Sequence, residues 1–195
     1  MEKIVRIPMF PLAILPVPGE LVPLHIFEPR YRQLLQDLET SDITFGIYCS
    51  HEINKTRIGS LMRLESVIKR YPGGESDIIV RCQDNFTLDL LLRTYKDKLY
   101  PGGDVSLWKA DSNVLPSPGL YASFVEYLRL RRISEHVAPF NIYQVAHELN
   151  LDVQSRYKFL TLGNDQRESF LSNTIRFQTY LLKQEEKSRD VFHLN

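Results

Sequence analysis

The sequence predicts an α+β protein in which an antiparallel β-barrel or sandwich with one inserted helix precedes a helical bundle. Three observations lead to this prediction. Short strand-like runs separated by turns fill residues 1–115, one amphipathic helix interrupts them near residue 30, and helical periodicity takes over after residue 115. We therefore expect a β-rich subdomain over 1–115 and a helical subdomain over 116–195.

The strands are predicted from short apolar runs that prolines, glycines or polar turns separate. Cys49 and Cys82 lie in two of these runs, and we expect both to be buried free thiols, as unpaired cysteines usually are. The predicted strands cover residues 3–10, 21–27, 43–49, 57–71, 76–82, 86–92 and 105–109.

Helix boundaries are predicted from capping residues and apolar spacing. Within the β-rich part a helix is expected to start at Pro29, because proline loses nothing at a first helical position, and its apolar positions are Tyr31, Leu34, Leu35 and Leu38. In the second part, the expected N-caps are Ser117 and Asp152, a shorter helix is expected to start at Asn141, and residues 165–168 resemble a capping box. The first of these later helices is expected to turn inward a stripe made of Tyr121, Phe124, Val125 and Leu128.

One tetrapeptide occurs twice, as residues 71–74 and 100–103, and reads Tyr-Pro-Gly-Gly each time. Proline sets φ for the first central position of a turn, and glycine accepts positive φ at the next, so we predict two type II turns. Phosphate binding is the alternative, but it lacks support because no Gly-Lys-Ser/Thr follows and neither turn opens a helix.

Composition and motif content give no catalytic residue, metal ligand or cofactor. Residues 1–115 carry 14 basic and 15 acidic residues and residues 116–195 carry 10 and 9, so neither half is the basic body of a general nucleic-acid binder. The histidines lack metal-ligand spacing, the cysteines form no C-x-x-C pair, and neither a Walker A sequence nor a G-x-S-x-G elbow is present. Two free cysteines are typical of a cytosolic protein, and neither a signal peptide nor a membrane span is expected, so we expect a cytoplasmic protein.

The opening of the chain carries the most specific pattern. Residues 7–12 read Ile-Pro-Met-Phe-Pro-Leu, a loop with Pro18-Gly19 follows, and residues 23–32 read Pro-Leu-His-Ile-Phe-Glu-Pro-Arg-Tyr-Arg. This resembles the start of the Lon protease N-terminal domain. Residues 57–61 resemble its next strand, with Ser60 in place of threonine, whereas residues 83–86 depart from its glycine-containing segment. Residues 143–178 resemble its helical annex.

The resemblance implies a PUA-like β-barrel followed by helices, and a non-catalytic module that binds unfolded or damaged polypeptides or a specific protein partner. No ATPase or protease sequence follows the annex, so a free-standing substrate-recognition domain, an adaptor or holdase in quality control, is expected. Weak association between copies of the protein is a further alternative that the sequence leaves open. The candidate protein-binding residues are Phe27, Glu28, Arg30 and Arg32 of the matched motif and the aromatic residues Tyr71, Tyr100 and Trp108.

Each candidate has a structural alternative. Glu28 and Arg30 can simply pair with each other, and the three aromatic residues can pack in the barrel. Trp108 is hypothesised to line a binding groove. An RNA-binding module is the second functional hypothesis, with Lys69, Arg70, Arg93, Lys96 and Lys98 as its basic candidates. A hydrolase whose catalytic residues are scattered in sequence is the third.

Overall fold

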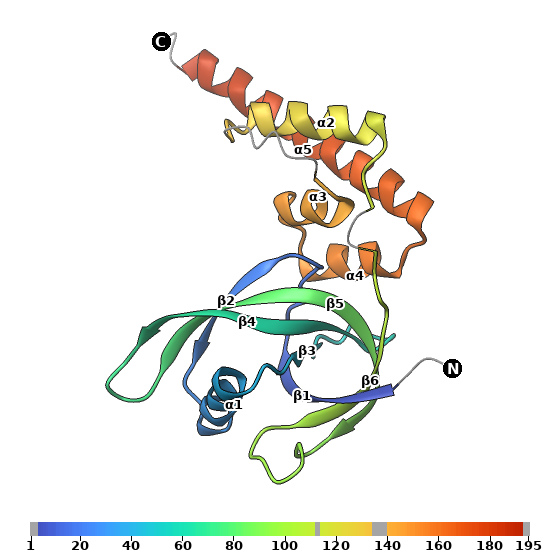
Figure 1. The fold of residues 1–195 in the computed structure, drawn as a ribbon. Coiled ribbons are helices and arrows are strands. Elements are labelled where there is room, and N and C mark those ends of the chain that lie inside the picture. Colours follow the sequence, from blue (N-terminus) through green and yellow to red (C-terminus); the bar gives the residue numbers. More distant parts are fainter. Residues whose placement is uncertain (1–3, 112–113, 134–139, 193–195) are drawn as a thin grey trace. The chain divides into compact units, whose positions relative to one another are not determined.

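The structure is a computed structural model and describes residues 4–111, 114–133 and 140–192. The chain divides into two compact units, Met1–Ser112 with Asp152–Tyr157, and Asn113–Leu151 with Lys158–Asn195. The first unit thus includes a short segment from the part of the sequence expected to be helical. Over the described residues the fold is mixed α+β, with six strands and five helices (Figure 1).

All six strands belong to one sheet in the first unit. The two longest, β4 (Ile58–Arg70) and β5 (Ser76–Leu92), form a hairpin. The expected strands over 76–82 and 86–92 are one strand, β5, because Asp84 and Asn85 between them stay paired with β4 and the chain does not turn. The others are β1 (Ile4–Leu12), β2 (Leu21–Ile26), β3 (Phe45–Cys49) and β6 (Gly102–Leu107).

The strand order is β2-β5-β4-β3-β1-β6, and β6 also pairs with β5. The pairings therefore run from β5 through β4, β3, β1 and β6 back to β5, while β2 lies outside this ring. The sequence predicted antiparallel pairing throughout, but β1 and β3 are parallel. The chain passes through β2 and α1 before it reaches β3, which supplies the crossover that a parallel pair needs.

Helix α1 (Pro29–Thr40) confirms the predicted start and the predicted apolar stripe. All four residues of the stripe are buried against the strands. The ring of Tyr31 stacks on Phe10 of β1 with centroids 3.8 Å apart. Cys49 and Cys82 are buried and free, also as predicted. The core of the unit is thus built from alternate strand residues and one helix face.

The first Tyr-Pro-Gly-Gly segment is a turn, but not the predicted one. The Gly74 N–H donates to the Tyr71 carbonyl at 2.9 Å, and the Tyr71 N–H donates to the Glu75 carbonyl at 2.9 Å. Positive φ falls on Gly74, at +91°, and not on Gly73 as a type II turn requires. This is the arrangement of a three-residue hairpin loop that ends in a left-handed glycine.

The second segment is not a type II turn either. Gly102 and Gly103 belong to strand β6, and neither has positive φ. A Cβ atom on Gly103 would lie 2.5 Å from Met9 and 2.8 Å from Leu88, so this glycine is needed for close packing and not for turning. The identical tetrapeptides therefore serve different structural purposes.

The helices after the sheet are α2 (Pro118–Leu130), α3 (Ile142–Glu148), α4 (Val153–Thr161) and α5 (Asn164–Phe192). The predicted N-caps Ser117 and Asp152 are confirmed, because their side-chain oxygens accept backbone N–H groups three residues ahead. Asn141, the predicted start of the next helix, is an N-cap as well and accepts the N–H of Gln144. The predicted capping box at 165–168 is wrong, since α5 already begins at Asn164. Glu168 instead accepts the N–H of Ser117 at 2.9 Å.

The buried face of α2 is rotated from the predicted one. Its buried residues are Leu120, Phe124 and Tyr127, whereas Tyr121 and Val125 are exposed. The difference follows from the hydroxyl of Tyr127, which donates to Gln178 of α5 at 2.6 Å and so allows a tyrosine to occupy the helix contact.

Candidate functional site

Strand β2 carries an exposed row of side chains on one face. Leu21, Pro23 and His25 alternate with inward-facing residues, and Phe27 continues the row just beyond the strand. Phe27 is 56% exposed, which is unusual for a large apolar side chain, and Leu21 is exposed as well. We call the row formed by Leu21, Pro23, His25 and Phe27 the β2 face.

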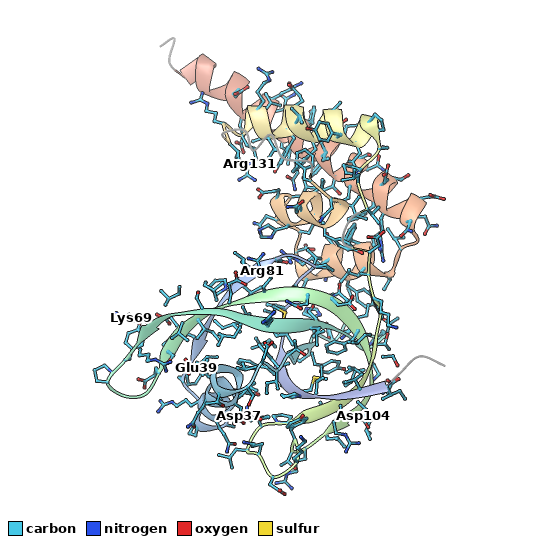
Figure 2. The ribbon with its side chains drawn as sticks, viewed as in Figure 1. Asp37, Glu39, Lys69, Arg81, Asp104 and Arg131 are labelled. Atoms are coloured by element: carbon cyan, nitrogen blue, oxygen red, sulfur yellow. The ribbon has the colours of Figure 1, made fainter. Side chains whose placement is uncertain are left out.

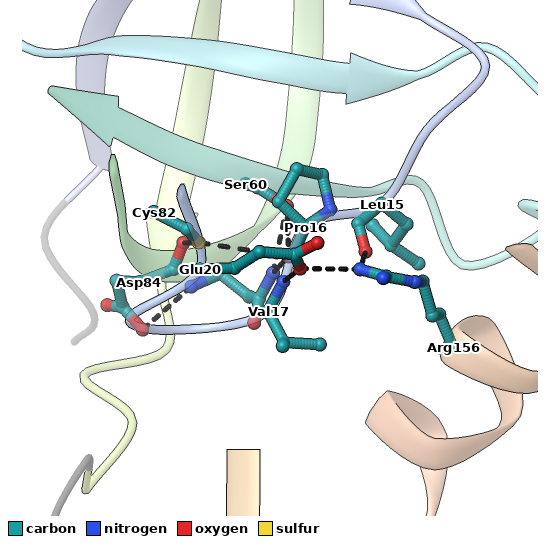
Figure 3. Close-up of polar contacts among 9 residues, drawn as sticks. Leu15, Pro16, Val17, Glu20, Ser60, Cys82, Asp84 and Arg156 are labelled. Carbon is teal, nitrogen blue, oxygen red and sulfur yellow. Dashed lines mark hydrogen bonds and ion pairs between the residues drawn. The ribbon is translucent and has the colours of Figure 1, made fainter. Parts of the chain in front are cut away.

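The loop before β2 is anchored by a buried ion pair. Glu20 accepts the N–H of Val17 at 3.0 Å and lies 2.5 Å from Nη1 of Arg156, in the first turns of α4 (Figure 3). Both side chains are nearly buried, at 9% and 14% exposed. The same loop offers the Pro16 carbonyl to the side chains of Ser60 and Asn85. The start of β2 is therefore held firmly in place.

Polar residues at the end of β2 form a compact cluster with the β4–β5 hairpin. Asp77 lies opposite His25 and accepts hydrogen bonds at 2.6 Å from His25 Nδ1 and from the Tyr71 hydroxyl. These two bonds lower the pKa of Asp77, the one from Tyr71 contributing most, and the bond to Asp77 raises the pKa of Tyr71. The His25 ring also lies 6.0 Å from Phe27 and 5.8 Å from Tyr71, centroid to centroid.

The matched segment that follows Phe27 has structural contacts. Glu28 and Arg30 form an exposed ion pair of 2.7 Å, as the structural alternative held. Arg32 donates to the Gly73 carbonyl at 2.8 Å and pairs with Glu75, so it holds the hairpin loop against α1. A Cβ atom on Gly74 would lie 2.7 Å from Nη1 of this guanidinium, so a side chain there would displace the Arg32 head group. Arg32 positions the loop that carries Tyr71.

The structure brings together five of the seven candidate residues: Phe27, Glu28, Arg30, Arg32 and Tyr71. It separates Tyr100 and Trp108 from them. Tyr100 is 1% exposed and belongs to the core, so its candidacy as a contact residue is wrong and the packing alternative is correct. Trp108 is half-buried at the far end of β6, where its indole N–H donates to Thr87 at 2.9 Å.

The hydroxyl of Tyr100 explains why a tyrosine is buried there. It donates to Asp37 of α1 at 2.6 Å, and Lys98 donates to the other oxygen of Asp37 at 2.9 Å. Desolvation is the largest influence on the pKa of Asp37 and raises it, but the hydrogen bonds from Tyr100 and Lys98 together outweigh it. The pKa of Asp37 is therefore below its ordinary value of 3.8.

We expect Asp37 to make the stability of the protein depend on pH in acid. Because its folded-state pKa is depressed, its stabilisation is fully present above pH 3.8 and is lost as the pH falls through the lower, folded-state value. Urea unfolding of the wild type and Asp37→Asn should differ most near neutral pH, and the difference should shrink below pH 3.8. A constant difference down to about pH 2 would contradict the assignment.

The basic candidates for RNA binding do not gather into one cationic surface. Arg70 pairs with Glu39, Lys98 pairs with Asp37, and Lys69 lies over the ring of Tyr71 at 4.5 Å. Asp37, Glu39 and Lys69 are labelled in Figure 2. Lys96 lies over Tyr95 at 5.1 Å, and Arg93 is exposed after β5. Next to the β2 face, Arg81 pairs with Glu65. Charges around this face are therefore largely balanced.

The His25–Asp77 pair resembles two members of a catalytic triad, but no nucleophile among the described residues completes it. In the part of the chain that the structure describes, no serine, threonine or cysteine side chain hydrogen-bonds to His25. The thiols are poor candidates, since burial raises the pKa of both Cys49 and Cys82. Residues 4–111, 114–133 and 140–192 also contain no group of three or more potential metal ligands.

The second unit has an open groove of about 390 Å³ between α2, α3 and α5. Its walls include Tyr127, Arg131, Leu149, Leu181 and Leu182. Next to it on α5, Phe177 and Tyr180 are exposed, and Phe177 is 62% accessible. This surface provides an internal comparison for the β2 face, because it exposes a phenylalanine to a similar extent on a different element.

Sequence reasoning missed Leu21, Pro23 and His25 as members of the candidate surface. The apolar run over residues 21–27 predicted the strand but could not say which of its two faces is exposed. The proline inside the run was the available signal, because proline in a strand favours a sheet edge.

Residues 6–175 match the family described as the ATP-dependent protease La (LON) substrate-binding domain. The chain belongs to this family. The matched range includes the opening motif, all of the sheet except the first residues of β1, and the helices up to the first part of α5. Among curated proteins, none matches the chain. No helix within the described ranges is long and apolar enough to span a membrane.

Two solved structures are similar to this Lon substrate-binding domain. A Lon N-terminal domain protein from Xanthomonas campestris has a TM-score of 0.63 and 22% sequence identity, over 81% of this chain and 90% of that one. The N-terminal domain of a Mycobacterium avium complex Lon protease has a TM-score of 0.50 and 15% identity, over 92% and 98%. At these identities the likeness concerns the fold.

Proposed function

We propose that this protein is a non-catalytic module that binds unfolded or damaged polypeptides, as an adaptor or holdase in cytoplasmic protein quality control. The observation that carries the proposal is the β2 face, where apolar side chains lie in a row that ends at the exposed Phe27. An exposed apolar surface of this kind gains free energy when a polypeptide covers it. Membership of a substrate-binding family supports the same reading.

We propose further that the sheet is a PUA-like barrel. The support is the ring of pairings, in which β6 pairs with both β1 and β5. Such closure would leave β2 as an additional strand on β5, with one long edge outside the ring. The binding surface then lies on the element that the barrel itself does not use.

A polypeptide is favoured over RNA by the charges near the site. Nucleic-acid affinity comes chiefly from unpaired cations that contact phosphates. Here Arg30, Arg32 and Arg81 each pair with a carboxylate, and His25 contacts Asp77. A largely neutral apolar surface suits segments that are exposed when a protein unfolds.

Binding to Phe27 is tested with a reduced, carboxymethylated and therefore permanently unfolded polypeptide carrying fluorescein. We expect saturable anisotropy with the wild-type protein and about tenfold weaker binding by Phe27→Ala, because one large apolar contact is lost. The matched control is Phe177→Ala, which removes an equally exposed ring from the second unit and should leave the affinity unchanged.

Two other outcomes would refute the β2 face or the proposed function. Weaker binding by Phe177→Ala with no effect of Phe27→Ala would place the site on the helical unit and refute the β2 face. Binding of a mixed-sequence RNA with a steep salt dependence, and none of the polypeptide, would refute the proposed function.

A further inference from the structure

The register between β2 and β5 is set where the two strands meet. Gly19 has a φ of +87° and its N–H donates to the Cys82 carbonyl at 2.8 Å, while the Cys82 N–H donates to the Glu20 carbonyl at 2.9 Å. This is a bulge in which Gly19 and Glu20 together oppose Cys82. Glu20 therefore occupies a hydrogen-bonded position with respect to β5.

Hydrogen-bonding direction alternates along an antiparallel strand, so the positions after Glu20 follow directly. Val22, Leu24 and Ile26 direct their backbone N–H and C=O groups toward β5, opposite Val80, Ile78 and Ser76. The backbone groups of Leu21, Pro23 and His25 then point away from β5. Pro23 fits this assignment, because proline has no N–H to contribute to a ladder and is tolerated where the edge is free.

The outward edge of β2 has no partner among the described residues. β2 pairs with β5 alone, and no described group hydrogen-bonds to the backbone of Leu21, Pro23 or His25. The edge thus presents two N–H donors and three carbonyl acceptors. All three residues are exposed.

We propose that this edge binds an extended polypeptide as an additional strand, so that substrate is recognised through its backbone. The inference rests on the proposed function and specifies its mode of binding. Only an extended chain offers donors and acceptors at the spacing of a strand edge. Every second side chain of the guest then lies beside Leu21, Pro23 and Phe27, which favours apolar residues there without demanding a particular sequence.

Pro23 has a defined consequence in this arrangement. It removes the central donor, so a guest strand forms bonds at Leu21 and His25 but leaves one of its carbonyls without a backbone donor. An incomplete edge of this kind limits lasting strand-to-strand association, including pairing between two copies of the protein. Binding through β2 is therefore expected to be weak and reversible, as suits a surface that receives many polypeptides.

The test varies the backbone donors and leaves the apolar surface alone. The probe is a fluorescein-labelled peptide of alternating valine and threonine residues with lysines at both ends. His25→Pro removes an outward N–H, and His25→Ala is its matched control, because it loses the same imidazole but keeps the N–H. We expect His25→Pro to bind about three- to tenfold more weakly than His25→Ala, as for one lost hydrogen bond.

Pro23→Ala is expected to have the opposite effect on binding. Unlike His25→Pro, it does not require the fold to accept a new proline in β2. It restores the central donor, so peptide binding should tighten by about three- to tenfold, and self-association should increase in sedimentation experiments. Amide exchange provides an independent readout in the wild type. The Leu21 and His25 amides should become protected on peptide addition, while those of Val22 and Leu24 are protected already.

Equal binding by His25→Pro and His25→Ala, or unchanged binding by Pro23→Ala, would overturn strand addition. If Phe27→Ala still weakened binding in that case, the proposed function and its surface would stand without the backbone mode. Absence of peptide binding and of unfolded-polypeptide binding by the wild type would overturn both.

Discussion

Replacing Arg156 by leucine is expected to lower the free energy of unfolding by about 3–5 kcal/mol, as for other buried ion pairs that lose one partner. Glu20 is 9% exposed, and Arg156 also donates to the Leu15 carbonyl at 3.4 Å. Removing the guanidinium leaves the carboxylate buried beside the N–H of Val17 without its cation. Urea unfolding followed by circular dichroism measures the loss.

Two further variants distinguish loss of the pair from loss of packing. Glu20→Gln combined with Arg156→Leu should recover part of the stability, because no buried charge then lacks its partner. Arg129→Leu removes an exposed cation from the 2.8 Å pair with Glu126 and should leave stability nearly unchanged. An Arg156→Leu variant as stable as Arg129→Leu would mean that the Glu20 carboxylate is hydrated and that the pair is not structural.

Replacing Gly59 by alanine is expected to destabilise the protein by about 2–3 kcal/mol through overpacking. Its Cβ atom would lie 2.5 Å from Cε2 of Phe86 and 2.8 Å from the Ile47 carbonyl oxygen. Phe86 is fully buried in the sheet core, so its ring has no space into which to move. Thermal and urea unfolding of the variant give the size of the effect.

The clash itself is tested by a double mutant. Phe86→Leu removes the ring atoms that meet the new methyl group and leaves only the contact with the Ile47 carbonyl. Gly59→Ala with Phe86→Leu should therefore lose at least about 1 kcal/mol less than the sum of the two single losses. Gly119→Ala is the control, since nothing lies within 4 Å of its Cβ position in α2, and it should be neutral or stabilising. Additive losses in the double mutant would place the cause elsewhere than in the contact with Phe86.

Local sequence signals predicted the elements where a few adjacent residues decide the conformation. The stripe Tyr31, Leu34, Leu35 and Leu38 and the proline start defined α1, because helical spacing places those side chains on one face. The caps at Ser117 and Asp152 were predicted as well, since a cap bond spans only three residues. The opening motif also pointed to the Lon substrate-binding family, which the comparisons bear out.

Predictions failed where a distant partner decides the outcome. The same tetrapeptide forms a hairpin loop at residues 71–74 but leads into strand β6 at residues 100–103, because Tyr100 is buried in the core and its hydroxyl donates to Asp37. The proximity of Phe27 to Tyr71 was missed for the same reason. Both rings lie beside His25, and the Tyr71 hydroxyl donates to Asp77. These contacts join residues that are far apart in sequence, so no local pattern predicts them.

The sequence by itself determined which segments are strands or helices, where most helices begin and to which family the chain belongs. Only the tertiary structure decided which edge of β2 is free, which side chains of the motif are exposed and that Glu20 pairs with Arg156 across 136 positions of sequence. The physical reason is range: periodicity and capping depend on neighbours within about one turn or one strand, whereas pairing, burial and charge partners depend on residues that folding brings together.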